Sequence, residues 1–88
     1  MGWLSSEGIK PMEGNKMYNL NVRNIDNDIE IFDVNQSFES LEEAQKEMRI
    51  QVDLCKKDPN FMNLIYKDNY ANVLINYEDE YIWTITEK

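Results

Sequence analysis

The chain of 88 residues has no histidine and only one cysteine, and each scarcity removes a class of function. Histidine is the commonest general base, the commonest metal ligand and the usual switch near neutral pH, so its absence removes all three. The one cysteine, Cys55, has no partner for an internal disulfide, which favours a reducing compartment and leads us to expect a cytoplasmic protein. A cysteine–histidine nucleophile within one subunit is also excluded.

Glycine and long apolar runs are scarce as well. The three glycines are Gly2, Gly8 and Gly14, so the rest of the chain has no glycine-rich loop that could hold a phosphate. No apolar run approaches the ~20 residues of a membrane span. The N-terminal sequence MGWLSSEGIK has neither the basic nor the apolar part of a secretory signal. We therefore expect no membrane partner.

Two places in the chain are candidates for a chemical site, a calcium loop at residues 26–30 and a reactive thiol at Cys55, and the sequence argues against both. Residues 26–30 begin like a calcium loop, but Ile31 stands where that loop needs glycine and Ser37 where it needs glutamate. Cys55 lies on the apolar stripe of a predicted helix, which favours a buried structural thiol. We expect no metal, no cofactor and no enzymatic activity.

The N-terminal part differs from the rest of the chain. Residues 1–16 contain all the glycines and Pro11 but show no periodicity, which predicts a flexible arm or an artificial extension. The alternative is that Trp3 and Leu4 fold back onto the body or onto a partner. Residues 17–88 are expected to form a single α+β domain.

The first patterned segment predicts a hairpin. Tyr18, Leu20 and Val22 alternate with polar residues, as in a half-buried strand. Residues 24–28 are rich in Asn and Asp, which predicts a turn, and residues 29–34 predict a second strand. That strand alternates imperfectly, which indicates either burial on both faces or a bulge that switches the facing side.

Residues 40–57 form the only long run with helical periodicity. Ser40 and Glu43 have the spacing of a capping box, and Asp58-Pro59 ends the helix. The stripe expected to face a sheet consists of Leu41, Ala44, Met48, Val52 and Cys55. Ile50 and Leu54 lie on the opposite side. Three interpretations of this pair are open. The two residues are ordinary surface residues, they are covered by another part of this chain, or they contact a partner or a second copy.

The last third predicts a second hairpin. Residues 58–66 favour a short helix, since Phe61, Leu64 and Ile65 have helical spacing, with a brief strand as the alternative. Residues 71–77 and 81–86 alternate as strands on either side of a turn at Glu78-Asp79-Glu80. This order predicts an α+β fold with a four-stranded antiparallel sheet, built from two β-hairpins, packed on one main helix.

The charge of the chain is strongly one-sided. A net charge of −8 argues against direct contact with nucleic acid or an anionic membrane and favours a basic partner protein. The candidate partner-binding residues form an acidic face of Asp26, Asp28, Glu30, Glu39, Glu42, Glu43 and Glu47. A second acidic group consists of Glu78, Asp79 and Glu80, and a possible apolar contact of Ile50 and Leu54. The plain alternative is a surface that only keeps the protein soluble.

The short, acidic chain is rich in Asn, Ile, Lys and Tyr, lacks catalytic residues, and has its acids concentrated between Asp26 and Glu47. In this overall character it resembles the small proteins of phages and mobile elements of low-GC bacteria, including anti-CRISPR proteins. Several of those are acidic α+β domains that occupy the nucleic-acid grooves of a Cas effector. The resemblance implies a non-enzymatic protein that inhibits or regulates a larger basic protein. The alternative is a structural, homodimeric module without inhibitory activity.

Overall fold

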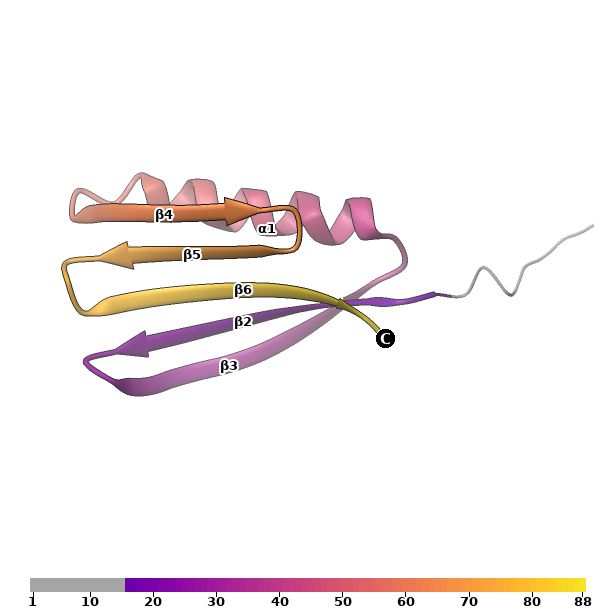
Figure 1. Ribbon diagram of the computed structural model, residues 1–88, viewed down its shortest axis with the longest axis horizontal. Coiled ribbons are helices and arrows are strands. Elements are labelled where there is room, and N and C mark those ends of the chain that lie inside the picture. The colour runs from indigo at the N-terminus through magenta and orange to yellow at the C-terminus, as the bar shows by residue number, and fades with distance from the viewer. Residues whose placement is uncertain (1–15) are drawn as a thin grey trace, which may run out of the picture.

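The computed structural model describes residues 16–88, which form one helix packed on a five-stranded antiparallel sheet (Figure 1). The elements are β2 (Tyr18–Asp26), β3 (Ile29–Phe38), α1 (Leu41–Lys56), β4 (Phe61–Lys67), β5 (Tyr70–Ile75) and β6 (Asp79–Glu87). The strand order is β3-β2-β6-β5-β4, so β3 and β4 are the edges and β6 lies in the centre. The predicted arm falls almost wholly outside the described residues. Within 16–88 no helix is long and apolar enough to cross a membrane.

Helix α1 forms where its sequence predicts. The Ser40 hydroxyl accepts a hydrogen bond from the Glu43 N–H at 3.1 Å and caps the first turn. Ala44, Met48 and Val52 are buried against the sheet, so the predicted inward stripe is confirmed at its centre. The two ends of the stripe, Leu41 and Cys55, are half-buried and pack against the same core.

The core lies between α1 and one face of the sheet. Alternate residues of the inner strands point to this face, because successive side chains of a strand point to opposite sides. The buried strand residues are Leu20, Val22, Ala71, Val73, Ile75, Trp83 and Ile85. Full burial of each large apolar side chain contributes roughly 1.5–3 kcal/mol, and this face therefore provides most of the stability of a small domain.

The prediction of a short helix over residues 58–66 is wrong, and with it the prediction of four strands. These residues form a turn and the edge strand β4, which pairs with β5. A register shift between Phe61 and Asn63 brings Phe61 and Leu64 to the same face of the sheet, so a bulged strand acquires helical spacing. The Asp58 carboxylate accepts from the Asn60 N–H at 2.8 Å, forming a turn instead of a helix cap.

The first hairpin turn lies within the predicted residues 24–28 but is shorter, and the second lies two residues before the predicted one. The first turn is Asn27-Asp28, with φ of 54° and 66°, so β2 extends through Asn24 to Asp26. The second is centred on Asn76 and Tyr77, with φ of 53° and 65°. Asp79 and Glu80 therefore belong to β6, and only Glu78 of the predicted acidic turn lies in a turn. Left-handed φ values at consecutive residues suit tight hairpins, whose twist matches that of the strands.

The imperfect alternation of residues 29–34 indicates either burial on both faces or a bulge. The structure shows a bulge in β3. Its register against β2 shifts opposite Asn24 and Ile25. Beyond the shift, Phe32 and Val34 face the helix side of the sheet, whereas Asp33 faces the open side beside Asn21. Every residue of β3 except Phe38 is exposed, because α1 does not extend over this edge.

Candidate functional site

Three turns bring carboxylates together at one end of the molecule. We call this group the acidic end, and it consists of Asp26, Asp28, Asp58, Glu78 and Asp79. Strand pairing places Asp26 opposite Asp79, and the Asn27 N–H donates to the Glu78 carbonyl at 3.1 Å. Four of the five line a polar hollow of about 290 Å³, and no lining residue is basic. Glu78 and Asp79 of the second acidic group therefore adjoin the first hairpin, whereas Glu80 lies outside the hollow and accepts a hydrogen bond from the Asn72 amide at 2.6 Å.

The acidic end has no cationic partner among residues 16–88. The three ion pairs in this range are Lys16–Glu87, Arg23–Glu30 and Lys56–Asp53, with N–O distances of 3.4, 2.9 and 4.0 Å. Of the predicted site residues, only Glu30 is paired with a cation from the part of the chain that the structure describes. One carboxylate of the acidic end is also held in place, since the buried Asn24 amide donates to Asp79 Oδ1 at 2.6 Å. The remaining negative charge faces solvent.

The other half of the predicted acidic face lies at the opposite end of the molecule. Glu39, Glu42 and Glu43 stand at the start of α1, whereas both acidic hairpin turns lie near its end (Figure 1). Glu47, further along α1, accepts a hydrogen bond from Gln51 at 2.8 Å. The structure thus divides the predicted acidic face into two parts. That either part binds a partner stays a prediction.

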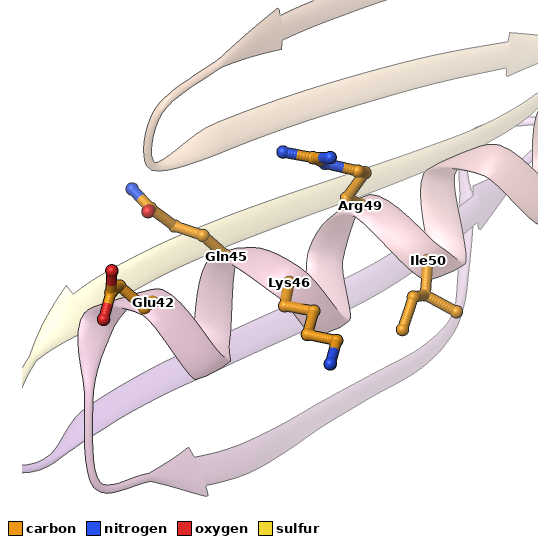
Figure 2. A pocket seen from close by; sticks show the side chains of 5 residues that line it. All are labelled: Glu42, Gln45, Lys46, Arg49 and Ile50. Atoms are coloured by element: carbon orange, nitrogen blue, oxygen red, sulfur yellow. The ribbon is translucent and has the colours of Figure 1, made fainter.

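The exposed side of α1 has a second hollow, of about 530 Å³, which does not look like a chemical site. Its lining residues are Glu42, Gln45, Lys46, Arg49 and Ile50. Figure 2 shows these side chains pointing away from the helix in different directions, with no common point on which they converge. Lys46 and Arg49 also dilute the negative charge of Glu42. This surface is therefore a mixed, solvated helix face.

An apolar groove lies between α1 and the edge strand β3. Its volume is about 370 Å³. It is lined by Val22, Phe32, Val34, Gln51, Leu54, Cys55, Tyr81 and Trp83. The polar atoms at its floor are paired, since the Trp83 indole N–H donates to Gln51 Oε1 at 2.9 Å. What the groove offers to solvent is thus almost entirely apolar surface.

The rim of the groove is well exposed. Val34 has 51% and Leu54 has 61% of its surface accessible to solvent. Leu54 belongs to the predicted apolar contact, but Ile50 lies outside the groove and lines the hollow on the helix face. Sequence reasoning did not find the groove, because nothing in the pattern shows that α1 leaves the β3 edge uncovered. Its only signal was the run of apolar residues in 29–34 that alternated imperfectly.

The acidic end adjoins the groove. Burial raises the pKa of the Cys55 thiol above its ordinary value, and the charges of Asp79 and Asp58 raise it further. Burial likewise raises the pKa of the Tyr81 hydroxyl, followed by the effect of Asp79. Both groups line the groove, so the field of the acidic end extends into it.

The aromatic residues near these surfaces differ in their availability. Tyr77 projects from the second hairpin turn with 78% of its surface exposed. Tyr81 is half-buried and stacks on Trp83 with ring centroids 5.9 Å apart. Trp83 is only 1% exposed and belongs to the core. Tyr77 is therefore the aromatic side chain best placed to contact a partner beside the acidic end.

Comparison with known proteins gives this chain no relative: no family model, no curated protein and no solved structure matches it. Among residues 16–88 there is also no group of three or more cysteine or acidic side chains arranged to hold a metal ion.

Proposed function

We propose that this chain is a non-enzymatic binding protein that inhibits or regulates a larger basic protein through protein–protein contact. The partner would be of the kind whose basic groove holds nucleic acid. The observation that carries the proposal is the acidic end, where five carboxylates from three turns gather without a cationic partner in the described residues 16–88. A chain of net charge −8 repels nucleic acid itself but attracts the protein surface that binds it.

The mechanism has two physical stages. Long-range attraction between the acidic end and a basic groove orients the encounter and raises the association rate by about 10- to 1,000-fold at low salt. Short-range contacts then hold the complex, with the exposed ring of Tyr77 as the nearest aromatic anchor. Salt weakens the first stage, because the screening length falls to about 8 Å at physiological ionic strength.

Two matched variants test which acidic part carries the function. The first is Asp26→Asn, Asp28→Asn and Glu78→Gln at the acidic end. The second is Glu39→Gln, Glu42→Gln and Glu43→Gln at the start of α1. Each removes three exposed negative charges and changes the net charge equally, so any difference between them reports location. Asparagine at residue 28 also suits the left-handed backbone there.

The full chain and both variants are used to capture proteins from lysates of the cells in which the chain is made. We expect one basic protein to be captured by the wild type and by the α1 variant but not by the acidic-end variant. The captured protein should elute with moderate salt and lose nucleic-acid binding in the presence of the chain. Capture that ignores both salt and the acidic-end substitutions would contradict the proposal. Thermal unfolding of each variant shows that the fold is retained.

A second candidate function is that of a self-assembling module without inhibitory activity. The observation in its favour is the exposure of Ile50, which has 46% of its surface accessible. Its contact would be made by Ile50 and Leu54 on α1. Sedimentation at several concentrations separates the two functions. A dimer that dissociates in Ile50→Asp would support self-assembly, and a monomer at all concentrations would exclude it.

A further inference from the structure

Within the sheet formed by residues 16–88, strand β3 offers an edge that is suited to binding another strand. It is the outermost strand on its side of the sheet formed by residues 16–88. From Phe32 to Phe38 its pairing with β2 runs without a register shift, so the outer edge is regular over this stretch. The other edge strand, β4, is shorter and has a bulge near its start. An extended peptide adds to a regular edge through main-chain hydrogen bonds.

The two sides of this edge differ in chemistry. On the helix side, Phe32 and Val34 border the apolar groove opposite Leu54. On the open side stand the carboxylates of Asp33, which accepts from Asn21, and of Glu30, which pairs with Arg23. Successive side chains of an added strand point to alternate sides. One set would therefore enter the groove and the other would lie beside the carboxylates.

The groove could be occupied by a second copy of this chain, by its residues 1–15 or by a partner protein, and charge complementarity distinguishes the three. A second copy of this chain carries the same net charge of −8, and the repulsion between two such chains disfavours its docking at this edge. The N-terminal residues 1–15 have two acids, Glu7 and Glu13, and one base, Lys10, so they offer no basic excess. A basic partner satisfies both the apolar groove and its acidic surroundings.

We propose that the edge of β3 and the apolar groove beside it bind an extended segment of a basic partner protein in which apolar and basic side chains alternate. This inference rests on the proposed function and adds the place and manner of docking. Apolar side chains of the segment lie between Val34 and Leu54. Basic side chains face Glu30 and Asp33, and the end of the segment nearest the β2–β3 turn lies beside the acidic end.

A synthetic octapeptide of alternating lysine and valine is the probe. As a strand it spans about 26 Å, long enough to cover the regular part of β3. A control octapeptide has the same composition with its lysines and valines in separate blocks. Calorimetric titration into the full chain should show the alternating peptide binding at least about tenfold tighter than the control. Equal binding of the two peptides, or no binding of the alternating one, would overturn the inference.

One substitution separates groove docking from simple charge attraction. Val34→Glu places a carboxylate at the groove rim, where 51% exposure leaves room for the longer side chain. Charge attraction alone predicts tighter binding of the basic peptide, whereas docking in the groove predicts binding weaker by about tenfold or more. Ile65→Glu, on the edge strand β4 and 44% exposed, is the matched control and should not weaken binding.

Cys55 gives a second readout, because it is the one thiol of the chain and lines the groove. Saturation with the alternating peptide should slow its alkylation several-fold, and saturation with the block peptide should not. If residues 1–15 occupied the groove instead, the full-length variant Trp3→Ser, Leu4→Ser would alkylate faster and bind the peptide more tightly. If a second copy occupied it, alkylation would slow as the protein concentration rises. Either result would overturn the inference.

The inference and the proposed function can fail separately. Peptide binding that resists Val34→Glu but is lost in the acidic-end variant would remove the groove and leave electrostatic docking in place. Groove binding of the alternating peptide with no basic protein captured from lysate would support the docking surface and remove the proposed partner class.

Discussion

The Cys55 side chain shows how much a single position depends on its neighbours in space. The sequence correctly places it on the inward stripe of α1, and the structure leaves it half-buried at the wall of the groove. The sequence could not show that Asp79 lies near it, because Asp79 comes from a distant strand. The prediction of a buried thiol is therefore right about the face of α1 on which Cys55 lies and wrong about the extent of its burial.

We predict that the protein loses stability at alkaline pH partly through Cys55. Its pKa in the folded state is raised above the ordinary value of 9.0, so folding favours the neutral thiol. The stabilisation is fully present below pH 9.0 and is lost as the pH rises through the raised pKa. Urea unfolding followed by circular dichroism should show a smaller loss in Cys55→Ser than in the wild type just above this pH.

Tyr81 acts in the same direction at higher pH. Its pKa is raised above the ordinary value of 10.0, so its contribution is lost only beyond that pH, in both the wild type and the variant. The comparison for Cys55 is therefore made at lower pH. Parallel losses in the two proteins would show that the thiol does not contribute.

At the scale of the elements, the sequence predicts those whose signals are local. Helix α1 has its cap, its stripe and its ending within one continuous segment, and all three are confirmed. Strand β4 was mistaken for a helix because its bulge places Phe61 and Leu64 on one face, and because an Asp-Pro pair suits a turn as well as a helix start. The bulge depends on pairing with β5, which no pattern within β4 itself reveals.

The turn between β5 and β6 gives a prediction at this scale. Tyr77 adopts a φ of 65°, where a bulky residue is strained and glycine is not. Tyr77→Gly keeps the N–H that donates to the Met62 sulfur and should stabilise the fold by about 0.5–1 kcal/mol. The same variant should weaken capture of the basic partner, since it removes the exposed ring.

Chemical unfolding and partner capture measure the two effects on the same protein. Asn76→Gly is the control, because asparagine already tolerates its φ of 53° and the change should alter stability by only a few tenths of a kcal/mol. A loss of stability in Tyr77→Gly would show that the tyrosine ring makes a stabilising contact. Unchanged capture would exclude the ring as an anchor.

At the scale of the whole molecule, the grouping of charges was beyond sequence reasoning. The acids of the first hairpin and of residues 78–80 lie far apart in the chain, and the sequence treats them as separate groups. The two groups meet because β2 and β6 pair along their full length, so that Asp26 at the end of β2 lies opposite Asp79 at the start of β6. The acids of residues 39–43, close to the first hairpin in sequence, are carried to the other end by the length of β3. Proximity along the chain was therefore a poor guide to proximity on the surface.

The excess of like charge predicts that salt stabilises the protein. The chain has 17 acidic and 9 basic residues. The three ion pairs within residues 16–88 all involve exposed side chains and offset little of the repulsion. Screening should relieve it, so the midpoint of thermal unfolding at neutral pH should rise between low and physiological ionic strength.

Thermal unfolding in a series of sodium chloride concentrations measures this effect. The acidic-end variant Asp26→Asn, Asp28→Asn, Glu78→Gln should start from a higher midpoint and rise less. A midpoint that falls with added salt would mean that favourable charge pairs outweigh the repulsion.

The central position of β6 bears on when the protein can fold during its synthesis. Among the described elements β6 comes last in the chain, yet within the sheet it is the strand that joins the pair β2–β3 to the pair β4–β5. Until it leaves the ribosome, Leu20 and Val22 lack the strand that carries Ile85 and Trp83. Before that point α1 can contact strands of both pairs, but the sheet lacks its central strand, so we expect the sheet to close only after β6 has been translated.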